Sequence, residues 1–175
     1  MTLEQPAAEP ALSASLIELA PVDLAATLVD REGLKRLIPH RDVMLLPDRI
    51  VWRAEDGHSC IGAKHIRDDE FWVKGHFPGR PLFPGVLMVE TGAQVATYLF
   101  NSHLDSPTLA AFLRIEDCAF RNAVKPGNEV LFLCKVIKAS KRRFVSRIQG
   151  LVDDRIAFEA TITGMSVPDD TLLGD

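Results

Sequence analysis

The chain of 175 residues is 47% hydrophobic and 25% charged, with a formal net charge of -4. These values are typical of one globular domain, and the 11 glycines and 11 prolines exclude a collagen-like or low-complexity chain. No apolar run approaches the ~18 residues of a membrane span, and residues 1–30 contain no Lys or Arg, which argues against a secretory or transit signal, so we expect a cytoplasmic protein without a membrane span.

An N-terminal extension over residues 1–30 is expected to precede one domain over residues 31–170. The stretch 1–21 is rich in Ala, Pro and Glu and has weak periodicity, which indicates a flexible or partly helical segment. Leucines within 22–37 fall at roughly helical spacing, so we predict a short helix there that ends before Pro39.

Two strands are predicted next, over residues 43–53 and 57–66. A turn-forming Glu-Asp-Gly sequence separates the two runs. Pro47 lies within the first run, and proline cannot donate a backbone hydrogen bond to a neighbouring strand. The first strand is therefore expected to be bent or to lie at a sheet edge.

Residues 71–85 are expected to form a loop of fixed shape, because three prolines and three glycines exclude a regular helix or a central strand. The residues that follow, 86–101, are apolar nearly all round, which predicts a buried helix. Glu90 and Gln94 interrupt this pattern on one narrow stripe of the helix. A carboxylate thus enters an otherwise apolar helix.

The rest of the chain has the pattern of a β-sheet. Four strands are predicted, over residues 108–120, 129–139, 143–152 and 156–167, with Pro-Gly-Asn and Asp-Asp turns between them. Two strands, one long buried helix and four strands together predict an α+β arrangement, in which an antiparallel β-sheet wraps around a long central α-helix.

Cysteine and histidine spacing argues against a disulfide framework and against a metal site. The three cysteines form no C-x-x-C pair and are expected to be reduced and packed. The five histidines show no H-E-x-x-H or other ligand spacing. We therefore expect no metal.

The loop and the start of the helix bring together groups suited to proton transfer. His76 lies in a rigid Gly-His-Phe-Pro-Gly-Arg-Pro loop and is the candidate base. Gly85 precedes the helix, where unpaired N–H groups and the positive end of the macrodipole stabilise an oxyanion. Glu90 is the candidate acid, with burial expected to raise its pKa, and Gln94 is placed to orient its carboxyl.

A base, an acid and an oxyanion donor are the groups that elimination of water from a 3-hydroxyacyl thioester requires. Each residue also has a simpler interpretation, since a histidine in a proline-rich loop can be structural and a glutamate on a buried helix can cap or form a salt bridge. The conjunction of His76 and Glu90 with Gly85 favours the catalytic interpretation.

The same residues carry a resemblance to a known family. Gly75-His76-Phe77-Pro78-Gly79-Arg80-Pro81, Pro84-Gly85-Val86-Leu87-Met88-Val89-Glu90 and Ala93-Gln94 closely resemble the signature of the 3-hydroxyacyl-[acyl-carrier-protein] dehydratases of type II fatty acid synthesis. Similarity in Leu37-Ile38-Pro39-His40-Arg41, Asp48-Arg49, Phe120-Arg121 and Val124-Lys125-Pro126-Gly127 extends the resemblance over roughly residues 34–167.

The resemblance implies a hotdog fold and an obligate homodimer, in which the histidine of one protomer and the acid of the other form each site. It assigns these roles to His76 and Glu90, and the oxyanion donor to Gly85. It also implies a cofactor-free conversion of a (3R)-3-hydroxyacyl thioester to the trans-2-enoyl thioester. Many members assemble as a trimer of dimers. Glutamate at the acid position favours simple dehydration over additional isomerisation.

Residues 121–147 are strongly basic, with eight Lys or Arg residues and one Glu. The implied substrate donor, acyl carrier protein, is in general strongly acidic, which gives this segment a partner for electrostatic steering. The candidate docking residues are Arg121, Lys125, Lys138, Lys141, Arg142 and Arg143. A solvated strand face without a partner is the alternative, and the scarcity of interleaved aromatic residues argues against nucleic acid.

Two other classes of function stay open at this stage. A thioesterase or a coenzyme A ester hydratase would share the hotdog fold, and release of free thiol would separate hydrolysis from dehydration. A non-catalytic acyl-binding regulator would carry a helix-turn-helix, and no such segment is evident before the domain.

Overall fold

The computed structural model describes residues 14–167. Its elements, in chain order, are α1 (Arg31–Leu37), a 3-10 turn (Asp42–Met44), β1 (Arg49–Arg53), β2 (Ser59–His65), α2 (Gly85–Asn101), β3 (Leu109–Phe120), β4 (Glu129–Ala139), β5 (Arg143–Val152) and β6 (Arg155–Val167). The helix after the proline-rich loop and the four strands that follow it agree with the predicted elements to within about one residue at each end.

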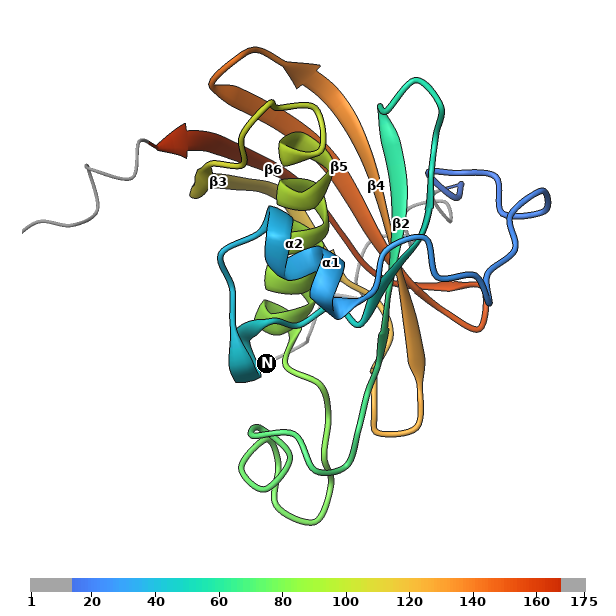
Figure 1. The fold of residues 1–175 in the computed structure, drawn as a ribbon. Coiled ribbons are helices and arrows are strands. Elements are labelled where there is room, and N and C mark those ends of the chain that lie inside the picture. The colour runs from blue at the N-terminus through green and yellow to red at the C-terminus, as the bar shows by residue number, and fades with distance from the viewer. Residues whose placement is uncertain (1–13, 168–175) are drawn as a thin grey trace, which may run out of the picture.

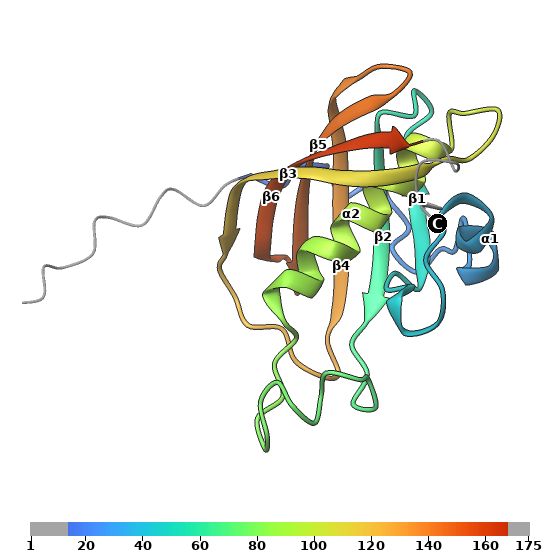
Figure 2. The same ribbon diagram turned by 90° about the vertical axis from the view of Figure 1, so that its left-hand side faces the viewer.

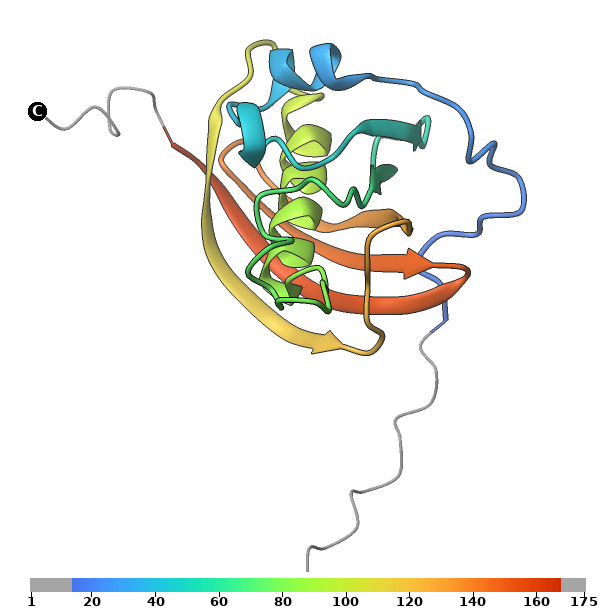
Figure 3. The same ribbon diagram turned by 90° about the horizontal axis from the view of Figure 1, so that it is seen from below.

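The six strands form one antiparallel sheet in the order β1-β2-β4-β5-β6-β3. The sheet curls around α2, which lies along its concave face (Figure 1). Seen from below, the strands surround α2 on one side, and α1 lies near the C-terminal end of α2 (Figure 3). The α+β arrangement predicted from the order of the elements is confirmed.

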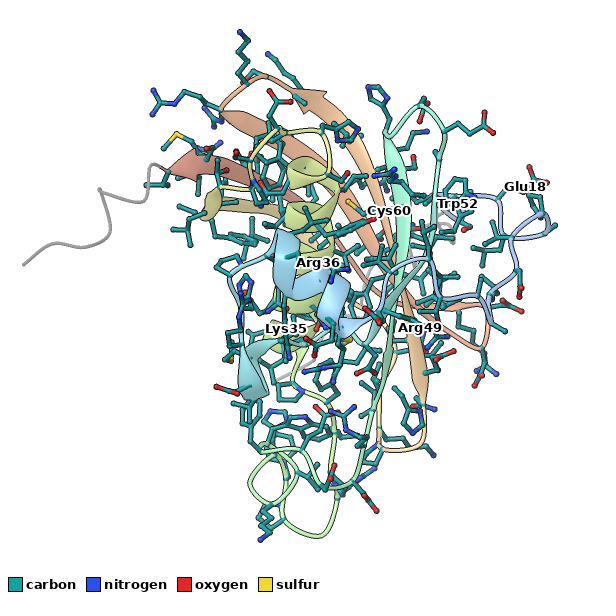
Figure 4. The ribbon with its side chains drawn as sticks, in the orientation of Figure 1. Glu18, Lys35, Arg36, Arg49, Trp52 and Cys60 are labelled. Atoms are coloured by element: carbon teal, nitrogen blue, oxygen red, sulfur yellow. The ribbon has the colours of Figure 1, made fainter. Side chains whose placement is uncertain are left out.

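Helix α2 packs closely on the sheet because it is apolar and because small residues lie at the contact. Its C-terminal two thirds are buried almost without interruption, including Tyr98 and Leu99. A Cβ added to Gly92 would lie 2.6 Å from Ile148 Cδ1 of β5, so a larger residue here would require the Ile148 side chain to move. Cys60 of β2 also points toward this helix (Figure 4).

The outer face of the sheet is covered by the N-terminal segment. Leu16, Leu19 and Leu24 are among the residues of this segment that pack on a second apolar cluster around Ile61 and Leu133. Figure 4 shows Glu18 on this segment, on the side of the sheet away from α2. This part of the N-terminal extension therefore shields the sheet from water; residues 1–13, also predicted to be flexible or helical, lie outside the described residues.

The predicted helix over residues 22–37 is wrong in its first half. Helix α1 begins only at Arg31, where the Asp30 carboxylate accepts a hydrogen bond from the Gly33 N–H at 2.7 Å and caps the first turn. The residues before it form turns up to about residue 26, after which Leu28 and Val29 exchange backbone hydrogen bonds with Ile50 of β1. Pairing with the edge of the sheet thus overrides the helical spacing.

The predicted first strand also begins too early. Residues 43–48 contain the end of a 3-10 turn and an irregular stretch, and β1 starts at Arg49, after Pro47. The Gln94 amide of α2 forms hydrogen bonds with the backbone of this stretch: it donates to the Met44 carbonyl at 2.8 Å and accepts from the Leu46 N–H at 3.0 Å. The helix, rather than the sheet, satisfies these backbone groups.

Strand β3 forms one edge of the sheet (Figure 2), and several of its apolar side chains are exposed. Phe112, Leu113, Ile115 and Phe120 are each between 42% and 53% exposed. Cys118 of the same strand is exposed, contrary to the expectation that all three cysteines are packed, whereas Cys60 and Cys134 are buried. None of the described helices is long and apolar enough to cross a membrane.

Candidate active site

The loop between β2 and α2 is fixed to the domain by a buried ion pair. The Lys64 ammonium of β2 lies 3.0 Å from the Glu70 carboxylate, and the two side chains are 1% and 6% exposed. The Trp72 indole N–H and the Arg67 backbone N–H also donate to this carboxylate, each at 3.0 Å. The start of the loop is therefore anchored to β2.

His76 is held in one orientation within this loop. Its Nδ1 lies 2.8 Å from the Leu82 carbonyl oxygen, and its own carbonyl accepts a hydrogen bond from the Leu82 N–H at 2.8 Å. A carbonyl only accepts, so Nδ1 carries the proton in the neutral ring and Nε2 keeps its lone pair. Phe77 stacks on the imidazole at 4.1 Å between centroids. The fixed tautomer is that of a base at Nε2.

His76 and Gly85 line the same cavity, which has a volume of about 470 Å³. Gly85 is the first residue of α2, so its N–H is one of the helix amides without a partner one turn back. A Cβ at this position would lie 2.8 Å from Phe120 Cε1, which leaves glycine the best fit beside the Phe120 ring. The remaining lining residues are Leu82, Phe83, Pro84, Val86, Met88, Phe120, Arg121, Asn122, Ala123 and Val124.

Glu90 is on another side of the same helix. Five residues separate it from Gly85, which places it about 140° further around the axis at about 100° per residue. Its Oε1 accepts a hydrogen bond from Gln94 Nε2 at 2.8 Å and lies 3.4 Å from His40 Nε2. Gln94, which is itself held by two backbone groups of residues 44–46, therefore orients the Glu90 carboxyl.

The expectation that burial raises the pKa of Glu90 is wrong. The contact with His40 lowers this pKa most, burial acts in the opposite direction, and the Gln94 hydrogen bond lowers the pKa further. Their sum places the pKa below its ordinary value of 4.5. His40 was not among the candidate site residues, because the sequence places it 50 positions before Glu90 and only its occurrence in a Pro-His-Arg sequence marked it.

Within one chain, His76 and Glu90 share no hydrogen bond or ion pair. His76 belongs to the cavity with Gly85, whereas Glu90 faces Gln94 and His40. The chain thus places the candidate residues in two separate groups: His76 with Gly85 at the cavity, and Glu90 oriented by Gln94.

The six basic residues do not form one surface on the chain. Arg121 and Lys125 lie in the β3–β4 connection, and Arg121 lines the cavity. Lys138, Lys141, Arg142 and Arg143 lie around the β4–β5 turn, at the top of Figure 1. Strand β4 separates the two groups and spans roughly 35 Å at about 3.3 Å per residue. The Arg121 guanidinium is also paired with Glu159, with its Nε at 2.9 Å.

The chain matches the family model described as a FabA-like domain over residues 38–161. Among similar proteins, the 3-hydroxyacyl-[acyl-carrier-protein] dehydratase FabZ of Desulfotalea psychrophila is 32% identical over 137 residues, covering 77% of this chain and 91% of that protein. The protein of the same name from Paramagnetospirillum magneticum is 35% identical over 143 residues, covering 79% and 87%.

Solved structures show the same fold at low sequence identity. The dehydratase heterocomplex ApeI:P from Xenorhabdus doucetiae superposes with a TM-score of 0.70 at 12% identity, covering 80% of this chain and 94% of that one. Cj0977, a sigma28-regulated virulence protein from Campylobacter jejuni, superposes with a TM-score of 0.62 at 14% identity, covering 82% and 94%. The sheet wrapped around α2 is the hotdog fold, as the sequence resemblance implied. With this fold, the family match and the relatives above 30% identity, the chain belongs to the FabA-like family as a 3-hydroxyacyl-[acyl-carrier-protein] dehydratase of the FabZ type.

Proposed function

We propose that this protein dehydrates (3R)-3-hydroxyacyl-[acyl-carrier-protein] to trans-2-enoyl-[acyl-carrier-protein] in fatty acid biosynthesis, without a cofactor. The observation that carries the proposal is the cavity shared by His76 and Gly85, in which the hydrogen bond to Leu82 leaves His76 Nε2 free to accept a proton. The FabZ relatives act on the same class of substrate by name. We also propose a cytoplasmic location.

In the proposed reaction, His76 Nε2 removes the proton on the carbon next to the thioester carbonyl. The Gly85 N–H stabilises the negative charge that develops on the carbonyl oxygen. The Glu90 carboxyl gives its proton to the departing hydroxyl, which leaves as water. Because the contacts within one chain lower the pKa of Glu90, its carboxylate predominates at neutral pH, and the protonated form that acts as the acid in this step is the minor one.

The two halves of the site require a second chain, and we propose that the β3 edge recruits it. An open strand edge offers unpaired N–H and C=O groups, and a sheet edge of this kind pairs readily with another strand. Its exposed Phe112, Leu113 and Ile115 would be covered by pairing β3 with the β3 of a second copy. Such a homodimer would bring His76 of one copy toward Glu90 of the other. A trimer of dimers is a further possible assembly of the same unit.

To test this proposal, the purified protein is incubated with a medium-chain (3R)-3-hydroxyacyl carrier-protein thioester, and the loss of one water from the thioester is followed by mass spectrometry. We expect enoyl product from the native protein and losses of about 10²-fold or more in His76→Ala and Glu90→Gln, the range typical of a lost acid or base. Release of free carrier-protein thiol would indicate a thioesterase instead. A folded dimer that gives no enoyl product at any chain length tested would overturn the proposal.

We further propose that Arg121 and Lys125 guide the acidic carrier protein to the cavity, because they are the two candidate docking residues on its side of the sheet. Lys125→Glu is expected to raise KM for the carrier-bound substrate several-fold at low salt and less at high salt. Lys141→Glu, at the far turn, is the matched control. An equal effect of both variants would show that docking does not depend on the residues near the cavity.

A further inference from the structure

The segment over residues 38–46 lies against α2 at the level of Glu90 and is held there independently of Glu90. Two backbone groups of the segment, the Met44 carbonyl and the Leu46 N–H, are hydrogen bonded to the Gln94 amide. In the same segment, His40 places its Nε2 3.4 Å from Glu90 Oε1. Both side chains are partly buried, at 27% and 30% exposure.

The backbone around His40 is fixed by its neighbour. The Arg41 guanidinium donates to the Lys35 and Ile38 carbonyls at the C-terminal end of α1, at 2.9 and 2.8 Å. It also donates to the His40 carbonyl at 2.8 Å. Arg41 therefore joins the end of α1 to the turn that presents His40, and the imidazole is not carried on a free loop.

The other ring nitrogen of His40 identifies the tautomer. Nδ1 is buried and has no hydrogen-bond partner among the described residues. A proton on Nδ1 would be a buried donor without an acceptor, which is costly, and more so on a charged ring. The neutral ring with its proton on Nε2 avoids this cost and directs the proton at the carboxylate, which only accepts. At 3.4 Å the contact is longer than an ordinary N–H···O bond, and in the single chain it is a close contact of the two groups rather than a formed hydrogen bond; contacts of this kind tighten when substrate binds.

We propose that His40 is a positioning residue for the dehydration: its neutral imidazole donates Nε2–H to Glu90 Oε1 and, together with Gln94, turns Oε2 toward the substrate hydroxyl. This inference rests on the proposed function. Both partners of Glu90 contact Oε1, and no described residue bonds to Oε2. One carboxylate oxygen is thus used for orientation, while the other is left for the proton transfer.

Few charged groups face Glu90, which makes the effect of His40 measurable. Glu90 is the one charged residue of α2. In the facing segment, Arg41 is engaged with α1 carbonyls and Asp42 is exposed, so within residues 14–167 His40 is the titratable side chain recorded in contact with Glu90. In the proposed dimer the partner's His76 adds one more group. The contact with His40 is also the largest cause of the lowered Glu90 pKa, through hydrogen bonding and, to a smaller extent, through charge.

The experiment compares His40→Gln, which keeps a neutral N–H donor, with His40→Met, which fills similar space without a donor. His58→Ala is the control, because His58 is an exposed residue of the β1–β2 turn. For each dimer, kcat and KM are measured as a function of pH. The pKa of Glu90 is measured separately, from the ¹³C shift of its labelled carboxyl, with Glu90→Gln to assign the signal.

We expect His40→Met to lower kcat by about 10-fold or more with KM nearly unchanged, since orientation rather than binding is lost. The pKa of Glu90 should rise in this variant. His40→Gln should keep both quantities near the native values, and His58→Ala should match the native protein. Equal losses of kcat in His40→Gln and His40→Met, or an unchanged Glu90 pKa in His40→Met, would overturn the proposal. A native protein that does not dehydrate the substrate would refute the proposed function. The carboxyl titration would still show whether His40 acts on Glu90.

Discussion

The loop that carries His76 and the segment that contacts Glu90 are both irregular, yet they are fixed to the domain by different interactions. A buried ion pair between Lys64 and Glu70 anchors the first. Two hydrogen bonds of the Gln94 amide and three donated by the Arg41 guanidinium anchor the second. The loop holds His76 at the cavity beside Gly85, whereas the segment lies against the partly exposed Glu90 carboxyl.

The two anchors also differ in the charge that they place near the candidate site residues. A buried ion pair requires both of its partners, because either charge alone is very unfavourable in the protein interior. An amide satisfies backbone groups without introducing a charge next to Glu90, so the carboxyl keeps a simple electrostatic environment. In the proposed dimer, the loop anchored by the ion pair supplies the base, and the segment anchored by hydrogen bonds supports the acid that meets the partner.

Breaking the ion pair should give the largest effect. Lys64→Met leaves Glu70 buried without its partner, which typically costs about 3–5 kcal/mol of unfolding free energy. The double variant Lys64→Met/Glu70→Gln should recover most of this loss. Urea unfolding at fixed protein concentration measures both.

The matched control for this prediction is an ion pair at the surface. Lys35 lies 2.6 Å from Glu32, and the two side chains are 36% and 70% exposed. Lys35→Met should cost well under about 1 kcal/mol, because solvent screens exposed pairs. Equal costs of Lys35→Met and Lys64→Met would show that the buried pair does not anchor the loop.

The smaller effect concerns pH and the other half of the site. The pKa of Glu90 is lowered in the folded chain, so its stabilising contribution is present at neutral pH and is lost as the pH falls below the ordinary value of 4.5 and through the lowered pKa. The difference in unfolding free energy between the native protein and Glu90→Gln should therefore shrink on acidification. A difference that grows between pH 7 and pH 3.5 would indicate a raised pKa instead.

Periodicity predicted the parts of the fold that are decided by burial. Helix α2 is apolar nearly all round, and turn-forming residues separate the last four strands. The predicted ends of these five elements therefore agree closely with the structure. The segments over residues 22–30 and 43–48 were predicted wrongly, because Ile50 and Gln94, from other elements, take up their backbone hydrogen bonds. Local patterns do not reveal such partners.

The candidate site divides in the same way. The motif indicated His76, Gly85, Glu90 and Gln94, and the cavity and the Gln94 hydrogen bond agree with roles for them. The direction of the Glu90 pKa shift was predicted wrongly, because its main cause is His40, on a distant segment. The basic residues were close in sequence, but the length of β4 separates them in space.

In the proposed dimer, each active site combines His76 of one chain with Glu90 of the other. This arrangement is tested by mixing His76→Ala with Glu90→Gln under conditions that exchange subunits and then measuring enoyl product. Half of the mixed dimers are heterodimers, each with one intact site, so activity should recover to about one quarter of the native value. No recovery, with heterodimers shown to form, would mean that the two residues do not act across the interface.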